Sequence, residues 1–322
     1  MAFTTTSPAA AVASAVRSFT RVADLDAEEL IALLDLAVEM RANPLARRPT
    51  LEGRSLACYF AEPSTRTRAS VEAAAWRLGM LPIVLRPDEL QLGRGEPLAD
   101  TARVLSAYAA ALFVRTSAQS DVDALAQAAS VPVINARTDQ HHPCQALADL
   151  LTIRDRYGAL GGLRVAYVGD GSNVAHSLIE AAALAGLHLM VATPAAFAPD
   201  PSIAAQAALT ARRHGGSLYL TDEPGIAVAD AHAVCTDGWV SMGRDEESAA
   251  RRAALAPFRV DAALMGKAHP QAIFLHCLPA HRGEEVAAEV IDGPASAVWK
   301  QAANRLPTEQ AVLYALVSGR WH

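Results

Sequence analysis

Apolar residues in the first half of the chain fall into short runs that alternate with stretches of helical periodicity. An amphipathic helix is expected to begin at Asp26, because Glu29 follows it at the spacing of a capping box. Its apolar positions recur at helical spacing: Leu30, Leu33, Leu34, Ala37 and Met40. Further runs predict strands at Leu56–Phe60, Leu112–Val114 and Val131–Ile134, with helical patterns through Trp76 and from about Pro143 to Tyr157.

A second alternating series follows a break at Gly158, Gly161 and Gly162. It opens at Leu163–Val168, and its later strand candidates are His188–Val191, Leu218–Leu220, Ala233–Cys235 and Ile273–Leu275, before a last helix over about Thr308–Val317. Strands that alternate with helices form parallel sheets covered on both faces. The pattern therefore predicts an α/β fold with two doubly wound parallel-sheet domains. Ligands of such sheets bind beyond the carboxyl ends of the strands, so the loops after each strand are where chemistry is expected.

Composition narrows the class of protein. The 322 residues are 52% apolar and 19% charged, which excludes a disordered chain. A net charge of −6 without a basic block argues against nucleic-acid binding, and no apolar run is long enough to cross a membrane. The segment Met1–Thr20 lacks the basic start and apolar block of a signal peptide and is expected to be a frayed tail; a transit peptide is the alternative. The four cysteines form no CxxC pair, which favours reduced thiols in the cytoplasm.

Two loops of the first half present groups that bind anions. In the segment 63–68, Ser64 is a natural helix N-cap, and two threonines and two arginines follow it directly. Free N–H groups, hydroxyls and guanidinium groups at one helix N-terminus form an oxyanion or phosphate cradle. The alternative is an ordinary cap with solvated arginines. Arg115 follows another apolar run, where it is either a ligand of the same site or a surface residue.

The segment His142-Pro143-Cys144-Gln145 begins a predicted helix. Proline suits the first helical position and keeps His142 extended just before the helix. A helix N-terminus disfavours the imidazolium form, so a neutral imidazole could donate a hydrogen bond to a carbonyl oxygen. The alternative is a capping histidine. The spacing of His141, His142 and Cys144 matches no zinc pattern.

Three loops of the second half also carry candidate ligands. The segment 169–173 is an incomplete dinucleotide motif, because Val174 stands in place of the third glycine, and a tight turn presenting Asn173 describes it better than an NAD site. The segment 237–243 offers a carboxylate, a hydroxyl and a glycine hinge, suited to an amino-acid-like ligand. In His276-Cys277-Leu278-Pro279, adjacent side chains point in different directions, so His276 and Cys277 are not a nucleophile pair. A nucleotide-dependent oxidoreductase is the alternative that the missing glycine argues against.

Together these segments resemble the ornithine carbamoyltransferases, from about Phe19 to Ala315. The motifs that carry the resemblance are Ser-Thr-Arg-Thr-Arg around Arg66, His142-Pro143-Cys144-Gln145, Asp237 with Ser241-Met242-Gly243, and His276-Cys277-Leu278-Pro279. Further stretches agree: residues 91–96, 100–105 and 304–306. Several motifs in the same order are far more specific than any one of them.

The resemblance implies a carbamoyl-phosphate domain over 1–150 and an ornithine domain over 151–305, with a C-terminal helix, 306–322, that returns to the first domain. It also implies a homotrimer with shared active sites, into which Gln91 reaches from a neighbouring subunit. The phosphate ligands would be Ser64, Thr65, Arg66 and Thr67. The carbamoyl group would contact Arg115, His142 and Thr67, with Gln145 and Arg305 completing that pocket. The ornithine ligands would be Asn173, Asp237, Ser241 and Met242, with Cys277 and Leu278 beside the side-chain amine.

The implied reaction transfers a carbamoyl group from carbamoyl phosphate to the amine of L-ornithine, without cofactor or metal. Arg66, Arg115, His142, Asp237 and Cys277 are the expected catalytic residues. The resemblance also implies a cis peptide bond between Leu278 and Pro279. No lysine precedes Lys267, which argues against the aspartate enzymes, because these place a lysine from a neighbouring subunit in the site.

The chain departs from the family pattern at four positions, Glu62, Gly238, Ala303 and Pro307. The family often has lysine at the first, a larger residue at the second, glutamate at the third and histidine at the fourth. These departures leave open a sister enzyme that acts on putrescine or a modified ornithine, or a catalytically weak homologue.

Overall fold

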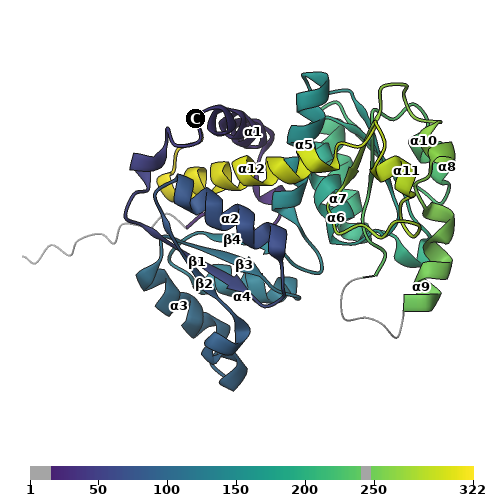
Figure 1. Cartoon of the computed structure of the whole chain (residues 1–322). Helices are drawn as coiled ribbons and strands as arrows, with labels where there is room; N and C mark the ends of the chain where they lie inside the picture. The colour runs from purple at the N-terminus through teal and green to yellow at the C-terminus, as the bar shows by residue number, and fades with distance from the viewer. Residues whose placement is uncertain (1–15, 241–247) are drawn as a thin grey trace, which may run out of the picture.

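The computed structural model describes residues 16–240 and 248–322, which form two parallel sheets (Figure 1). The first sheet has the order β2-β1-β3-β4 and its strands all run in parallel. Its strands are β1 (Ser55–Phe60), β2 (Leu81–Leu85), β3 (Ala111–Arg115) and β4 (Val133–Arg137). Helices α3 (Leu98–Tyr108) and α4 (Gln119–Ala128) lie on one side of it, and α1 (Ala27–Ala42) and α2 (Thr65–Arg77) lie on the other.

The second sheet has the order β7-β6-β5-β8-β9 and is also entirely parallel. Its strands are β5 (Arg164–Val168), β6 (His188–Ala192), β7 (Ser217–Thr221), β8 (Ala233–Thr236) and β9 (Ile273–His276). Its helices are α6 (Asn173–Leu184), α7 (Pro201–Arg213), α8 (Pro224–Val228), α9 (Ser248–Leu255), α10 (Ala262–Met265) and α11 (Ala288–Ile291). Alternate residues of β5 enter different cores: Val165 and Tyr167 pack with α6, whereas Ala166 and Val168 pack with α8. This burial on both faces explains the continuous apolar run of the sequence.

Two long helices join the sheets. The first, α5 (Pro143–Tyr157), leads from β4 toward the second sheet, and Gly158 ends it with a positive φ that suits glycine. The second, α12 (Val298–Ser318), starts beside the second sheet and runs back across the first domain, where it packs on α1, α2 and α5 (Figure 1). The predicted fold class, two doubly wound parallel-sheet domains with a returning C-terminal helix, is confirmed.

Local signals account for several helix starts. Asp26 caps α1, and its side chain and that of Glu29 form the predicted capping box. Pro143 occupies the first turn of α5, as predicted. Ser64 stands at the N-cap of α2, as predicted, although its hydroxyl makes no capping hydrogen bond.

Three predictions of secondary structure need correction. The sequence interpretation missed β2, an edge strand that contains Pro82, a residue that edges tolerate because the sheet has no further partner there. The strand predicted from Val131 begins at Val133, after Pro132. The last helix begins ten residues before the predicted Thr308, at Val298, and continues through Pro307. Both α5 and α12 span the predicted domain limits, so the division at residues 150 and 305 stays a prediction.

The order of the strands in each sheet determines where a ligand can bind. In the first sheet, β1 lies between β2 and β3, so the loops after β1 and β3 diverge at the switch point of the topology. In the second sheet the corresponding point lies between β5 and β8. The candidate residues Arg66, Arg115, Asn173 and Asp237 all follow or end these four strands. Among the helices of residues 16–240 and 248–322, none has the length and apolar character to cross a membrane.

Candidate active site

The loop after β1 and the first turn of α2 carry the predicted phosphate cradle. Arg66 extends from α2 to the second domain, where its Nη2 donates a hydrogen bond of 2.6 Å to the carbonyl oxygen of Leu278. Burial lowers the pKa of Arg66, although Cys277 and Asp237 nearby favour the charged form. Arg68 instead pairs with Glu72 along α2, at 2.6 Å. Of the two arginines in the motif, Arg66 is therefore the one that faces the second domain.

Arg115 ends β3 and is only 8% exposed, which removes the alternative of a surface residue. Burial, with Arg137 as the next cause, lowers the pKa of Arg115 to about 10. Its Nη2 lies 3.9 Å from the carboxylate of Glu62, which also accepts hydrogen bonds from Arg137, at 2.7 Å, and from Ser117, at 2.8 Å. Glu62, where the family often has lysine, therefore compensates two neighbouring cations of the site.

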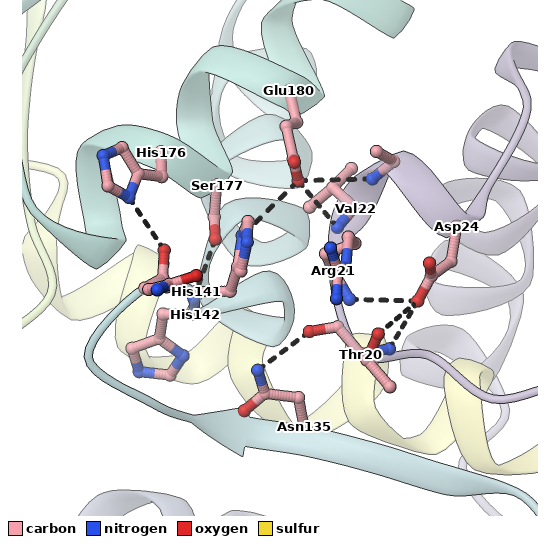
Figure 2. Close-up of polar contacts among 12 residues, drawn as sticks. Thr20, Arg21, Val22, Asp24, Asn135, His141, His142, His176, Ser177 and Glu180 are labelled. Atoms are coloured by element: carbon pink, nitrogen blue, oxygen red, sulfur yellow. Dashed lines mark hydrogen bonds and ion pairs between the residues drawn. The ribbon is translucent and has the colours of Figure 1, made fainter. Parts of the chain in front are cut away.

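His142 precedes α5 and is buried, with 5% of its surface exposed. Its backbone N–H donates to the hydroxyl of Ser177 on α6, at 2.7 Å (Figure 2). Its side chain makes no capping hydrogen bond, so the alternative of a capping histidine is not supported. Burial, followed by Arg305 and Arg115, keeps the pKa of His142 well below its ordinary value. The imidazole is therefore neutral, as predicted, but burial and nearby cations are the main causes rather than the helix N-terminus.

Arg305 on α12 ties three elements of the first domain together. It donates to the side-chain oxygen of Gln145, at 3.0 Å, and to the hydroxyl of Thr67, at 3.3 Å. Its charge partner is Glu309, one helical turn further along α12, and the guanidinium Nε donates to that carboxylate at 3.1 Å. Burial opposes the charge on Arg305, but Glu309 together with other neighbouring groups raises its pKa above the ordinary value. Gln145 also donates to Asp149, at 2.8 Å, and burial raises the pKa of this acid to about 6.

The second domain contributes Asp237 after β8 and Cys277 after β9. The Cys277 thiol donates to the Asp237 carboxylate, at 2.8 Å, and burial, reinforced by this carboxylate, raises the pKa of Cys277 well above its ordinary value. The thiol is therefore protonated and is not an activated nucleophile. Both nitrogens of His276 have other partners, because Nε2 contacts Glu285 at 3.1 Å and Nδ1 accepts the N–H of Leu278 at 2.8 Å. This agrees with the prediction that His276 and Cys277 form no nucleophile pair. The predicted cis bond between Leu278 and Pro279 is confirmed.

The remaining predicted ligands differ in their placement. Asn173 begins α6, is buried, and donates its side-chain amide to the carbonyl oxygen of Thr138. Gln91 is exposed in a short 3-10 helix, where its side-chain oxygen accepts from Arg94 at 3.3 Å, so it lies outside the buried cluster of this chain. Ser241 and Met242 lie outside the described residues.

Several partners in the site were not predicted. Glu309 could have been found, because it follows Arg305 at the i,i+4 spacing of a helical ion pair. Asp149 follows Gln145 at the same spacing. Glu62 and Ser177 carry no such local signal, since their partners lie on other elements.

The carboxylate, imidazole and thiol of the second domain are also side chains of the types that bind metal ions. Asp237, His276 and Cys277 offer ligand atoms within 4.8 Å of one another. These atoms are already engaged, because Cys277 donates to Asp237 and the two His276 nitrogens contact Glu285 and the N–H of Leu278. The expectation that the reaction needs no metal or cofactor stays a prediction.

Sequence comparison identifies the class of protein that this fold and site define. Residues 17–155 match the family model "Aspartate/ornithine carbamoyltransferase, carbamoyl-P binding domain", and residues 161–316 match "Aspartate/ornithine carbamoyltransferase, Asp/Orn binding domain". The chain belongs to the aspartate/ornithine carbamoyltransferase family, and the resemblance read from its motifs is confirmed.

Individual relatives point to one branch of that family. The chain is 52% identical to an ornithine carbamoyltransferase of Acidothermus cellulolyticus over 92% of this chain and 96% of the relative. A relative of the same name from Symbiobacterium thermophilum is 49% identical over 92% of this chain and 96% of its own length. Among solved structures, the ornithine carbamoyltransferase of Pyrococcus furiosus superposes with a TM-score of 0.90 at 46% identity, covering 95% of this chain and 98% of that chain.

Proposed function

We propose that this protein transfers the carbamoyl group of carbamoyl phosphate to the side-chain amine of L-ornithine, giving L-citrulline and phosphate. The observation that carries the proposal is that cationic and neutral donor groups of the first domain lie next to a carboxylate–thiol pair of the second domain. Arg66, Arg115 and neutral His142 come from the first domain, and the Asp237–Cys277 pair comes from the second. Curated relatives that cover nearly the whole chain bear the same function in their name.

The first domain, residues 1–150 with 306–322, is the proposed carbamoyl-phosphate domain. Its phosphate would lie at the first turn of α2, on Ser64, Thr65, Arg66 and Thr67. Backbone N–H groups and a guanidinium at a helix N-terminus stabilise a phosphate dianion, both when it is bound and when it leaves. Arg305 would support this site through Thr67, whose hydroxyl it contacts.

The carbamoyl carbonyl is the proposed target of Arg115, His142 and Thr67, with Gln145 at the side of the pocket. Attack by an amine converts this carbonyl oxygen into an oxyanion, which fixed donors stabilise more strongly than they stabilise the ground state. A neutral imidazole can donate one N–H here without placing a further charge beside the arginines. The step needs no covalent enzyme intermediate, which agrees with a protonated Cys277.

Residues 151–305 form the proposed ornithine domain, with Asn173, Asp237, Ser241 and Met242 on the amino-acid end. Cys277 and Leu278 would lie beside the reacting amine. A free alkylamine has a pKa of about 10.4 and attacks only when uncharged. The neighbouring charges of Arg66 and Arg115 disfavour a second cation and so lower the pKa of a bound amine.

The test is a set of assays with carbamoyl phosphate and each of three amines: L-ornithine, putrescine and an N-acylated ornithine. We expect citrulline and phosphate to form in equal amounts with ornithine, and far less product with the other two. His142→Ala serves as the control for background reaction. Faster carbamoylation of putrescine would agree with the proposed phosphate site but would refute the proposal that L-ornithine is the amine substrate.

We further propose that the chain acts as a homotrimer in the cytoplasm, in arginine biosynthesis, with Gln91 entering a neighbouring site. Exposed apolar side chains of the first domain support an interface between copies. Trp76 on α2, Leu81 on the edge strand β2 and Tyr108 on α3 are 57%, 62% and 69% exposed. Apolar groups next to an open sheet edge favour association.

Subunit mixing tests the shared site. Arg66→Ala and Gln91→Ala subunits, each weakly active alone, should form hybrid trimers in which some sites hold both wild-type residues. Activity should then exceed that of either parent, while sedimentation reports a trimer. Full activity of Gln91→Ala alone, or no gain on mixing, would remove Gln91 from the neighbouring site.

A further inference from the structure

Helix α6 of the second domain presents a stripe of four buried polar residues to the loop that carries His142. Asn173, His176, Ser177 and Glu180 follow the spacing of one helix face, and each is less than 9% exposed. Figure 2 shows three of them, His176, Ser177 and Glu180, directed at the segment that ends in His141 and His142. The loop belongs to the first domain, so the stripe is a contact between domains at the candidate oxyanion donor.

Within this contact, the peptide unit between His141 and His142 is held at both of its polar groups. Its carbonyl oxygen accepts the backbone N–H of Thr138, at 2.8 Å, and its N–H donates to the Ser177 hydroxyl, at 2.7 Å. Ser177 is completely buried. Without its hydroxyl the His142 N–H would lose its acceptor in a buried site, where an unpaired donor is costly.

His176 holds the loop one peptide unit earlier, and the two contacts of its ring define its tautomer. Its Nε2 accepts the backbone N–H of Asp200, at 2.9 Å, so the ring proton is on Nδ1 and donates to the carbonyl oxygen of Gln140, also at 2.9 Å. Burial lowers the pKa of His176, which keeps the ring in this neutral form. The second domain therefore binds two successive parts of the loop through groups whose donor and acceptor roles are set.

The His142 ring itself has no comparable anchor. Its Nδ1 is buried and has no hydrogen-bond partner among the described residues. The placement of the ring therefore depends on its backbone, which Pro143 restricts on one side and Ser177 holds on the other.

We propose that Ser177 is a positioning residue of the reaction: its hydroxyl, supplied by the second domain, aims the His142 imidazole at the carbamoyl oxygen. The inference rests on the proposed function of His142 as an oxyanion donor. One such donor contributes about 10²–10³ in rate, and a misplacement of about 1 Å can cost about a hundredfold. Ser177→Ala should therefore lower kcat by about ten- to a hundredfold. The KM for carbamoyl phosphate should change less than about threefold, because the phosphate ligands of α2 are untouched.

The decisive experiment is a double-mutant cycle of Ser177→Ala with His142→Ala. If Ser177 acts through His142, its replacement should have almost no further effect on kcat once the imidazole is gone. Ser177→Cys keeps the volume with a weak acceptor, so a fall in kcat there too excludes a packing effect. Ser106→Ala is the matched control, because the Ser106 hydroxyl on α3 also accepts a loop N–H, from Ser130 at 3.1 Å, away from the site.

A second measurement does not depend on turnover. The ring signal of His142 in a proton–carbon spectrum, assigned by its loss in His142→Ala, should shift in Ser177→Ala and stay in place in Ser106→Ala. Full additivity in the cycle, wild-type kcat in Ser177→Ala, or an unmoved ring signal would each overturn the proposal. A wild-type protein that makes no citrulline would instead defeat the proposed function, and the ring signal would still decide whether Ser177 positions His142.

Discussion

Glu180 on α6 is an acid whose carboxylate is buried between the N-terminal segment and the His141 ring (Figure 2). Its Oε2 accepts the backbone N–H groups of Val22 and Ala23, at 3.0 and 3.2 Å, and lies 3.7 Å from His141 Nδ1. Burial raises the pKa of Glu180 from 4.5 to about 7, against the opposite effect of the two N–H groups. The ionised form of Glu180 therefore has a higher free energy in the folded protein than in the unfolded chain. Glu180→Gln should remove the penalty while retaining an oxygen that accepts both N–H groups.

The penalty has a defined pH window. Below pH 4.5 the carboxyl is protonated in both the folded and the unfolded chain. As the pH rises from 4.5 to about 7, the unfolded chain releases this proton while the folded protein keeps it, so the free energy of unfolding falls. The full difference in pKa corresponds to about 3 kcal/mol. The stability advantage of Glu180→Gln over the wild type should therefore grow by about 2 kcal/mol between about pH 5.5 and 8 and then level off.

Urea unfolding of both proteins across this pH range measures the difference directly. Glu289→Gln is the control, since Glu289 is an exposed acid of α11 and the variant loses the same carboxyl group outside a buried site. A constant difference between Glu180→Gln and the wild type would refute the reasoning, because it would mean that Glu180 ionises in the folded protein as it does in the unfolded chain.

Three further predictions concern the site and its surroundings. Arg66→Ala should nearly abolish turnover while the fold stays intact by circular dichroism, and near-normal carbamoyl-phosphate binding by calorimetry would remove Arg66 from the site. Asp237→Asn should raise the KM for ornithine more than about a hundredfold, as expected for a buried charge pair that loses one partner, whereas His142→Ala should lower kcat by about 10²–10³. Steady-state kinetics with each substrate varied in turn distinguish the effect on KM from the effect on kcat, and normal use of ornithine by Asp237→Asn would contradict its role. Burial lowers the pKa of His141 to about 4, so the wild type should lose stability as the pH falls from 6.5 toward 4, and melting curves of His141→Asn should show a weaker loss.

Most strands could be predicted because each contains a short run of apolar residues. The run Leu163–Val168 is visible because both faces of β5 are covered, and the same holds for β1. The edge strand β2 also contains an apolar run, Ile83 to Leu85, but Pro82 stands directly before it, and proline is typical of loops and strand edges, so the strand was missed. The first half of α12 was missed because its buried face carries polar residues, including Asn304 and Arg305, whose partners lie on other elements.

The residues of the candidate site likewise fall into those that the sequence predicted and those that it did not. Arg66, Arg115 and Asp237 could be predicted, because parallel sheets place the ends of their strands at one edge. The groups that orient them depend on contacts between distant segments. Glu62 meets Arg137 across 75 positions of sequence, and Ser177 meets His142 across 35. No local period in the sequence contains such information.

The return of α12 to the first domain has a consequence for the order in which the protein is made. Chains emerge from the ribosome N-terminus first, and most domains fold as units in that order. Here the surfaces of α1, α2 and α5 that pack on α12 stay exposed to solvent until α12 has been synthesised. Arg305 also contacts Thr67 and Gln145 only then. A chain that stops before Val298 therefore has neither a closed first core nor a complete phosphate pocket. We therefore expect truncated chains to be degraded by proteases instead of accumulating as half-active enzyme.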